Sequence, residues 1–375
     1  RGVMLDCGRH YFPVKFIKEF IDLLAMHNMN RFHWHLTEDQ GWRLEIKKYP
    51  LLTAIGSKRA ETVIGHNTQI GDGTPYEGYY TQDEARDIVE YARQRHIVVV
   101  PEIDMPGHQL AALAAMPNLG CTGGPYKVGT VWGVYDDILC LGNEDTYKFC
   151  EDVLSELIDI FPSEVIHIGG DEAPTVRVEH CPKCQALMQR EHLTPKNIQG
   201  YFTNRIEKFV NSKGRRIMGW DEIMDGDINT SAMVHCWRNP SFGIKAAQKG
   251  HDVVLSPTKY CYFDFYQANP RAVHEPLAIG GYLPVDSVYN MDTMPKDISP
   301  ENRKHIIGIQ ANLWTEYVAV PNHAEYMLLP RMAALAENAW VKDRGPYSAF
   351  LPRLTRLKSL YDVYNLHYAN HVWKK

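Results

Sequence analysis

The stretch EVIHIGGDE, residues Glu164–Glu172, joins a short β-branched run to two glycines and two adjacent carboxylates. The β-branched run predicts a buried strand, and the Gly-Gly pair predicts a sharp turn at its carboxyl end. Barrel enzymes place their chemistry at the carboxyl ends of the strands, so Asp171 and Glu172 are candidate catalytic residues. An ordinary strand-end turn with a solvated acidic pair is the alternative, and the rest of the chain must distinguish the two.

Composition limits the possible classes of protein. The chain has 375 residues, 45% of them apolar, which is enough for one large core or two modest ones. Its 40 basic and 45 acidic residues give a formal charge of -5, which argues against a nucleic-acid partner or an anionic lipid surface. No apolar run approaches the roughly 18 residues of a transmembrane helix, so no membrane insertion is expected. A neutral or small polar ligand fits this composition better.

Short β-branched runs alternate with amphipathic stretches along the chain. Helices are predicted from Val14 to His27 behind Pro13, from Thr81 with a capping box to Glu84, and from Asn143 onward. Eight strands, each followed by a helix or a long loop, predict a (β/α)₈ TIM barrel in the α/β class. A doubly wound open sheet is the competitor, but no Gly-rich phosphate loop follows the first strand. The expected strands are Gly2–Asp6, Arg31–Leu36, Ile97–Ile103, Glu164–Gly169, Arg215–Trp220, Thr230–Trp237, Asp252–Ser256 and Ile306–Trp314.

Three long segments exceed what a minimal barrel of about 250 residues requires. Gly41–Tyr80, Pro117–Gly142 and Pro257–His305 follow the second, third and seventh expected strands, on the face where barrel active sites form. No composition break or Ser/Gly-rich linker interrupts the chain. We therefore expect residues 1–375 to form a single domain whose long loops shape a pocket.

Polar and aromatic residues collect where the expected strands end. A barrel brings these ends to one rim, so the side chains should lie together, although single members such as Glu102 have a structural alternative. Tryptophan usually packs in cores, but tryptophans beside carboxylates in a neutral-ligand pocket suit a sugar. The rim set comprises Asp6, Arg9, His33, His35, Glu38, Asp39, Glu102, Asp104, His108, Asp171, Glu172, Trp220, Asp221, Glu222, Trp237, Trp314 and Glu316.

Eight cysteines are scattered too sparsely for a disulfide scaffold, and most are expected to be buried thiols. The exception is Cys181-Pro182-Lys183-Cys184, a CxxC motif that could hold zinc or cycle as a dithiol. Because no second ligand pair stands at zinc spacing, a local disulfide or plain packing is favoured. Neither a metal nor a cofactor is expected.

Several motifs, in order along nearly the whole chain, resemble glycoside hydrolase family 20, the β-N-acetylhexosaminidases. Members of that family commonly carry a small α+β domain before the barrel, so this chain is expected to be the catalytic barrel alone, with the preceding domain absent from it. The resemblance also implies an exported protein, whether periplasmic, secreted or lysosomal. The motifs are Arg1–Asp6 with Arg9, HWHLTEDQGWR at His33–Arg43, PEIDMPGH at Pro101–His108, His167–Glu172, Gly219–Glu222 and Asn312–Glu316.

The resemblance implies a retaining exo-enzyme that removes terminal, non-reducing β-linked N-acetylglucosamine or N-acetylgalactosamine from a glycan. Glu172 matches the general acid/base, whose pKa a neighbouring Asp171 and partial burial should raise. The expected seventh strand ends in Leu255-Ser256-Pro257, without the carboxylate nucleophile of many barrel glycosidases. In the family, the substrate's own 2-acetamido oxygen attacks and forms an oxazolinium intermediate. Asp171 matches the residue that orients the acetamido N–H and stabilises its developing charge.

The same resemblance implies an acetamido pocket. Tyr262 matches a donor to the acetamido carbonyl, and Trp220, Trp237 and Trp314 match the walls around the methyl group. Family members often carry a further Trp after the seventh strand, but Ala278–Tyr282 has none. That wall is therefore in doubt.

Two further sets of residues match the family pattern. Arg9, Asp264 and Glu316 match the residues that hold the sugar hydroxyls. Asp39 and His108 match a supporting pair that positions the catalytic acid.

Two rival functions are weaker. A metal-dependent amidohydrolase would use His33-x-His35 as a chelate with Asp171, but in that family the HxH motif belongs to the first strand, whereas a complete strand precedes this one. Three tryptophans would also be unexplained. A sugar-binding barrel without catalysis is the rival from another class, and the intact Asp171-Glu172 pair argues against it.

Overall fold

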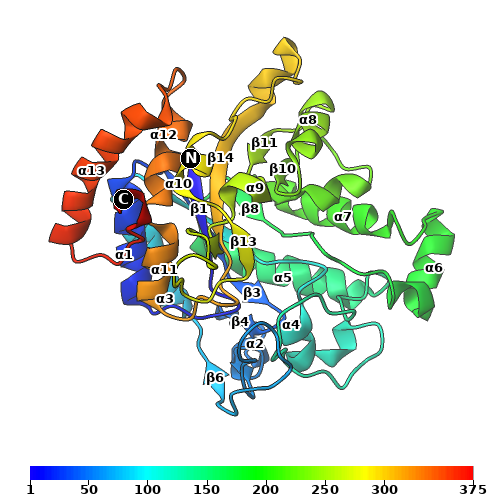
Figure 1. Cartoon of the computed structure of the whole chain (residues 1–375). Helices are drawn as coiled ribbons and strands as arrows, with labels where there is room; N and C mark the ends of the chain where they lie inside the picture. The colour runs from blue at the N-terminus through cyan, green and yellow to red at the C-terminus, as the bar shows by residue number, and fades with distance from the viewer. Residues whose placement is uncertain (375) are drawn as a thin grey trace.

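A computed structural model describes residues 1–374, which form a closed barrel of eight parallel strands surrounded by helices (Figure 1). Gly2 in the first strand pairs with Arg31 on one side and with Gln310 on the other, so the first strand lies between the second and the last and closes the barrel. The predicted (β/α)₈ barrel is confirmed, and the open doubly wound sheet is excluded. The barrel strands are β1 (Gly2–Asp6), β2 (Arg31–His35), β7 (Val98–Glu102), β8 (Val165–His167), β9 (Arg216–Trp220), β10 (Met233–Cys236), β11 (Val253–Leu255) and β14 (Ile306–Leu313).

All eight strands lie where the sequence predicts them, although seven are shorter than expected. The largest difference is in β10, expected from Thr230 and observed from Met233. Thr230 and Ser231 are exposed instead, and the backbone N–H of Ala232 closes a turn onto the carbonyl of Asn229.

The predicted helix starts are confirmed in detail. Thr81 accepts a hydrogen bond from the N–H of Glu84, whose side chain returns to the Thr81 N–H, so the capping box is complete. Asn143 caps its helix through the N–H of Asp145. The helices are α1 (Val14–Met26), α2 (Leu51–Ala54), α3 (Gln82–Arg93), α4 (Leu110–Ala115), α5 (Glu144–Ile160), α6 (Pro182–Glu191), α7 (Ile198–Ser212), α8 (Pro240–Gln248), α9 (Thr258–Cys261), α10 (Val285–Tyr289), α11 (Pro321–Leu328), α12 (Arg331–Trp340) and α13 (Tyr347–Val363).

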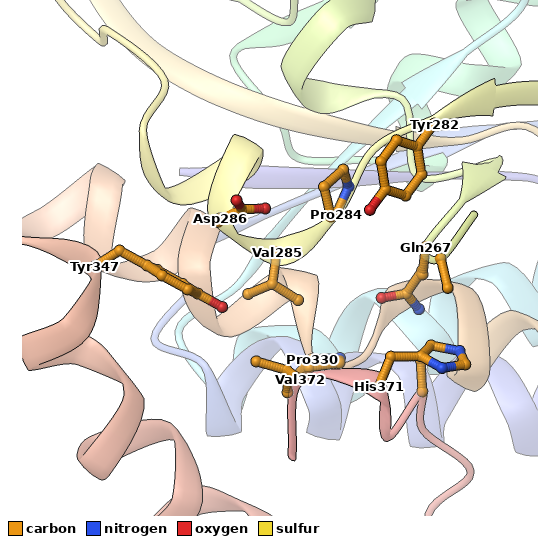
Figure 2. A pocket seen from close by; sticks show the side chains of 11 residues that line it. Gln267, Tyr282, Pro284, Val285, Asp286, Pro330, Tyr347, His371 and Val372 are labelled. Atoms are coloured by element: carbon orange, nitrogen blue, oxygen red, sulfur yellow. The ribbon is translucent and has the colours of Figure 1, made fainter. Parts of the chain in front are cut away.

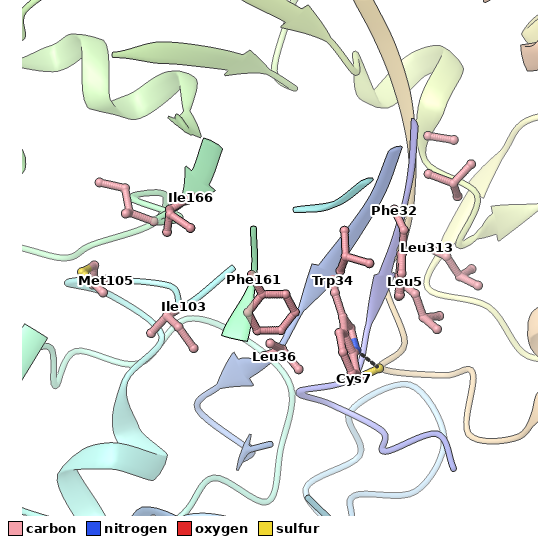
Figure 3. Packing of buried hydrophobic residues seen from close by; sticks show 14 of the residues in the cluster. Leu5, Cys7, Phe32, Trp34, Leu36, Ile103, Met105, Phe161, Ile166 and Leu313 are labelled. Carbon is pink, nitrogen blue, oxygen red and sulfur yellow. Dashed lines mark hydrogen bonds between the residues drawn. The ribbon is translucent and has the colours of Figure 1, made fainter. Parts of the chain in front are cut away.

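Alternation along β2 separates the two buried layers of the barrel. Phe32 and Trp34, with Leu36 just beyond the strand, belong to the large hydrophobic core that also contains residues of the surrounding helices. Figure 3 shows part of this core, where the indole N–H of Trp34 donates to the thiol of Cys7 at 3.3 Å. His33 and His35 alternate with these residues and face the barrel interior.

The interior is polar and organised around Glu102. This carboxylate lies 2.8 Å from His33 Nε2 and 3.0 Å from His167 Nδ1, and it also contacts His35 Nδ1. The indole N–H of Trp220 donates to Oε1 of Glu102, the oxygen that also lies near His167, at 3.0 Å. Glu102 is fully buried, and although burial alone would raise its pKa, the surrounding histidines hold the pKa well below its usual value. We therefore interpret Glu102 as a residue that holds the barrel interior together rather than as one that takes part in a reaction.

Two of the three long loops, those after β2 and β11, are held by buried arginines. Arg43 donates to the carbonyls of Cys7, Gly8, Ser57 and Gly78, which fixes the loop after β2 against the start of the chain. The remaining short elements of the chain are β3 (Thr37–Glu38), β4 (Gly41–Trp42), β5 (Lys58–Arg59), β6 (Tyr76–Glu77), β12 (Phe265–Tyr266) and β13 (Gly280–Tyr282), with 3-10 turns η1 (Pro117–Leu119), η2 (Val178–His180), η3 (Asp221–Asp225), η4 (Pro300–His305) and η5 (His371–Trp373).

Arg331 holds the loop after β11 in the same way. Its guanidinium is fully buried and donates to the carbonyls of Phe263, Phe265 and Leu283. These carbonyls flank the segment that carries Tyr262 and the short strands β12 and β13.

All eight cysteines are free thiols, so the local disulfide considered for Cys181 and Cys184 does not form. Among residues 1–374, no helix is long and apolar enough to cross a bilayer.

Candidate active site

The turn after β8 requires both glycines of the Gly169-Gly170 pair. Their φ angles are 65° and 95°, in the region that side chains rarely adopt. A Cβ on Gly169 would lie 1.8 Å from Asp104 Oδ1, and one on Gly170 would lie 2.7 Å from Ile223 Cγ2. Asp104 instead accepts the N–H of Gly170 at 3.0 Å. The glycines thus allow the chain to pass close to the neighbouring strand ends and to present the next two residues at the rim.

Asp171 and Glu172 differ sharply in environment. The side chain of Asp171 is 12% exposed, whereas that of Glu172 is 41% exposed. Glu172 also adopts a φ of 45°, a strained conformation in the left-handed region. One carboxylate of the pair is therefore buried, and the other stands at the mouth of the site.

His108, one of the two predicted supporting residues, connects the other, Asp39, to the predicted catalytic pair. Its Nδ1 lies 3.1 Å from Asp39 Oδ2, and its Nε2 lies 3.4 Å from Glu172 Oε2 and 3.8 Å from Asp171 Oδ2. Burial alone would lower the pKa of His108, but Glu38, Asp39 and Glu172 outweigh it and raise the pKa well above its usual value. The imidazolium form is therefore favoured.

The sequence-based expectation for the pKa of Glu172 is wrong for the free site. The hydrogen bond to His108 lowers the pKa of Glu172, because Glu172 is too exposed for burial to offset a neighbouring imidazolium. It is Asp171 whose pKa rises, to about 6, chiefly through burial. In the free site, a shared proton thus favours Asp171 over Glu172.

The predicted aromatic residues form a small apolar cluster separate from the main core. Trp220, Tyr262 and Trp314 pack together with Met4, and Trp237 and Phe265 lie against them. The Tyr262 ring is stacked with Trp237 at 6.0 Å between centroids and lies 6.4 Å from Trp314.

Trp237 is oriented by the turn after β9. Its backbone N–H donates to Asp221 at 2.9 Å, and its indole N–H donates to Glu222 at 2.9 Å. Burial raises the pKa of Glu222 to about 8, with a further contribution from Asp171.

Arg9 links several acidic side chains at the rim. Its Nη1 lies 2.8 Å from Glu38 and 3.4 Å from Asp6, its Nη2 lies 4.0 Å from Glu316, and the guanidinium is 5.1 Å from the Trp314 ring centre. Burial raises the pKa of Asp264, and the proximity of Glu316 adds to this effect.

Four buried polar atoms of the predicted site make no hydrogen bond to any of residues 1–374. They are Asp171 Oδ1, Arg9 Nε, Asp264 Oδ1 and Glu316 Oε2. Buried polar atoms are nearly always paired in folded proteins, so such a concentration at one rim indicates a site built for a polar ligand.

Glu38 is a central residue to which the sequence assigned no role. It contacts Arg9 at 2.8 Å, His108 Nδ1 at 3.0 Å and His35 Nε2 at 3.1 Å. Burial would raise its pKa, but Arg9 and His108 outweigh that effect and lower it. Its place just after the second expected strand put Glu38 in the rim set, but only the folded chain shows that it joins Arg9 to His108.

The amidohydrolase chelate does not form. Within the described residues, no compact group of possible ligands unites His33, His35 and Asp171, because both histidines direct a ring nitrogen toward Glu102. This arrangement does not fit the rival's metal centre.

A pocket of about 190 Å³ lies away from this rim, between β13, α10 and the C-terminal segment. Figure 2 shows Tyr282, Tyr347 and His371 around it, and it includes none of the predicted site residues. Tyr282, from the segment in which the additional Trp is missing, lines this side pocket.

Comparison with known proteins agrees with the geometry. Residues 1–343 match the model of the glycosyl hydrolase family 20 catalytic domain. The chain is 43% identical over 371 residues to a β-hexosaminidase of Porphyromonas gingivalis, covering 98% of this chain and 46% of the relative. It is 38% identical over 343 residues to a β-hexosaminidase of Vibrio furnissii, covering 90% and 56%. The chain thus spans about half the length of these curated relatives.

The fold comparison is equally close. The crystal structure of a family 20 exo-β-N-acetylglucosaminidase from Vibrio harveyi, in complex with N-acetylglucosamine, superposes with a TM-score of 0.86 at 35% identity. The match covers 100% of this chain and 59% of that one. With its closed barrel, its Gly-Gly-Asp-Glu turn and a family match over nearly its whole length, the chain belongs to glycoside hydrolase family 20.

Proposed function

We propose that this chain is the catalytic barrel of a retaining exo-β-N-acetylhexosaminidase. Its substrate is a glycan with a terminal, non-reducing β-linked N-acetylglucosamine or N-acetylgalactosamine. Catalysis is substrate-assisted and passes through an oxazolinium intermediate, with Glu172 as general acid/base and Asp171 as the residue that orients the acetamido group. The names of the relatives from Porphyromonas gingivalis and Vibrio furnissii support the activity.

One observation carries the proposal: Asp171 is a buried carboxylate with one oxygen unpaired among residues 1–374, next to an aromatic cluster. A group that enters such a place must donate a hydrogen bond and carry a small apolar part. A secondary acetamide does both, since its N–H can donate to Asp171 Oδ1 while its methyl group packs against Trp220, Trp237 and Trp314. A plain hydroxyl would leave the aromatic cluster without a partner.

The first step breaks the glycosidic bond. Glu172 donates its proton to the departing oxygen while the acetamido carbonyl oxygen attacks C1, so the C1–O bond to the aglycone breaks and the ring of the oxazolinium closes. Tyr262 donates a hydrogen bond to the attacking oxygen and keeps it aimed at C1. Ionised Asp171 stabilises the positive charge that develops on the acetamido nitrogen.

The second step restores the enzyme. Glu172, now a carboxylate, takes a proton from water, and that water attacks C1 and reopens the oxazolinium ring. Two displacements at C1 retain the β configuration. Because the acetamido group itself attacks C1, this mechanism needs no nucleophile from the protein. The end of β11 agrees with this, since Leu255 is followed by Ser256 and not by a carboxylate, and the Ser256 hydroxyl accepts a hydrogen bond from Asn312.

Protonation must be redistributed when substrate binds. In the free site Asp171 has a pKa of about 6, whereas His108 lowers the pKa of Glu172. An acetamido N–H donating to Asp171 stabilises its ionised form, and an aglycone covering Glu172 removes water from it. Both changes move the proton toward the residue that must donate it.

Arg9, Asp264 and Glu316 support exo-action. Each carries a buried polar atom without a partner in the described part of the chain, and together they suit the hydroxyls of a single terminal sugar. Hydroxyls held in this way close the pocket beyond the first sugar, so a chain cannot pass through it.

The decisive experiment compares a chromogenic N-acetylglucosaminide with the matched glucoside that lacks the acetamido group. We expect release from the first and almost none from the second, with the defect in kcat as well as KM. Efficient cleavage of the glucoside, or labelling of a protein carboxylate by a 2-fluoro sugar, would contradict substrate assistance. No release from either by a folded sample would favour the sugar-binding rival. On a chito-oligomer the product should be monosaccharide only, and early internal fragments would contradict exo-action.

A further inference from the structure

The structure brings four cysteines together outside the active site. Cys121 and Cys140 come from the loop between α4 and α5, and Cys181 and Cys184 are the CxxC pair at the start of α6. All four sulfur atoms lie within 4.8 Å of one another. The fold thus supplies a second pair of ligands, Cys121 and Cys140. This pair was not evident from the sequence because it lies 41 or more positions before the CxxC motif.

We propose that Cys121, Cys140, Cys181 and Cys184 form a structural zinc site that ties the loop after β7 to the segment after β8. Zinc prefers four thiolates in a tetrahedron with bonds of about 2.3 Å, which places the sulfur atoms about 3.8 Å apart. The measured Sγ–Sγ distances are 3.6 Å for Cys140–Cys181, 3.7 Å for Cys140–Cys184 and 3.9 Å for Cys121–Cys184.

The distances favour a shared centre over two disulfides. Cys140 is nearly equidistant from both sulfurs of the CxxC pair, as expected when all the sulfurs surround one ion. A pairwise bond would instead bring it to about 2.05 Å from one of them. Cys140, Cys181 and Cys184 are buried and Cys121 is half-buried, so the site is sheltered but has an open side through which a metal can enter.

The backbone around the cluster also suits thiolates. Cys181 is the N-cap of the ten-residue helix α6, and Cys184 lies in its first turn, where the helix dipole favours negative charge. The backbone of Gly142 lies directly against the peptide bond between Lys183 and Cys184. Only glycine fits there, because a Cβ would lie 2.2 Å from the carbonyl carbon of Lys183.

The cross-link would join the two segments that carry the catalytic groups. The segment after β7 carries His108, and the N–H of Leu139, next to Cys140, donates to the carbonyl of Pro106 at 3.0 Å. The segment after β8 carries Asp171 and Glu172 and reaches Cys181. Figure 1 shows α6 at the edge of the molecule.

The test uses the whole chain, expressed with zinc supplied and purified without chelator. Elemental analysis by mass spectrometry should find about one zinc per chain, and thiol titration of the denatured protein should find all eight thiols reduced. Cobalt added after zinc removal should give the thiolate-to-cobalt charge-transfer and tetrahedral d–d absorption of a four-sulfur site.

Two variants complete the design. Cys184→Ser should reduce the zinc content to below about a tenth per chain and lower the Tm. Cys150→Ser is the matched control, because Cys150 is equally buried but lies in α5 outside the cluster. The Cys150→Ser variant should still contain about one zinc per chain.

Three results would overturn the proposal: wild-type protein with less than about a fifth of a zinc per chain, a titration of four thiols, which would indicate two disulfides, or stoichiometric iron in place of zinc. If Cys184→Ser fails to fold, the zinc content and thiol titration of the wild-type protein still test the proposal.

Discussion

Replacing Asp171 by Asn should lower activity and raise stability together. The substitution keeps the size and shape of the side chain but removes the charge that the proposed mechanism places beside the acetamido nitrogen. Loss of one preorganised electrostatic stabiliser costs roughly 10²–10³-fold in kcat, or about 3–4 kcal/mol. We expect this loss in kcat with chromogenic N-acetylglucosaminide, and a smaller change in KM.

Stability should move in the opposite direction at neutral pH. The pKa of Asp171 rises from 3.8 to about 6 on folding, so the folded protein binds a proton more tightly than the unfolded chain between these values. Stability therefore falls as pH rises through this window, by about 3 kcal/mol in total at 1.36 kcal/mol per pKa unit. Asn removes this cost, so the Tm of the variant should exceed that of the wild type at pH 7, and the difference should shrink near pH 4.

The pH profile provides a third readout. Catalysis requires ionised Asp171, so wild-type kcat/KM should fall as pH drops below about 6. The Asn variant has no group to titrate there and should lose this acid limb.

Glu222→Gln is the control for Asp171→Asn. Glu222 has a pKa of about 8 and is mostly neutral at pH 7, so an isosteric amide should cost less than about tenfold. The reasoning is refuted if Asp171→Asn keeps kcat/KM within about fivefold of wild type, or if it retains an acid limb near pH 6.

Three further predictions test other parts of the site. His108→Gln removes a positive charge that lowers the pKa of Asp171, so the acid limb of kcat/KM should move above pH 6, and an unmoved limb would contradict the contact. Gly169→Ala should destabilise the fold by more than the 1–2 kcal/mol typical of a left-handed residue, because its Cβ meets Asp104, whereas Gly73→Ala, with φ 65° and open space, should cost only about that amount by thermal unfolding. A thiazoline mimic of the oxazolinium should bind at least about 10²-fold more tightly than substrate, and equal inhibition and substrate constants would argue against that intermediate.

The strands and helix starts could be predicted because their signals are local. Thr81 and Glu84 lie within one turn, and β-branched residues such as Val98, Val99 and Val100 are enriched in strands. Strand ends were less predictable, since Thr230 resembles a strand residue but lies in an exposed turn that closes before β10.

The rim residues could be identified from the sequence, but their charge states could not. A carboxylate's pKa depends on how deeply its own atoms are buried and on which charge lies nearest in space. Glu172 is the more exposed of the pair and lies beside His108, whereas Asp171 has the buried position. Adjacency in sequence suggested the opposite order of pKa values. The cysteine cluster could not be predicted from the sequence for a similar reason, because Cys121 and Cys140 come close to the CxxC motif only in the folded chain.

The barrel interior explains how the rim can hold so many unfavourable features. Glu172 at positive φ, Asp171 with an unpaired oxygen and the carboxyl of Asp264 each cost folding free energy. Below them Glu102 accepts from Trp220 and is surrounded by histidines, and Arg43 and Arg331 hold the loops through carbonyls that any sequence would supply. Because the carbonyl contacts of Arg43 and Arg331 do not depend on the rim charges, the rim can keep groups that become satisfied only when a sugar binds, and substitutions such as Asp171→Asn can therefore stabilise the protein while disabling it.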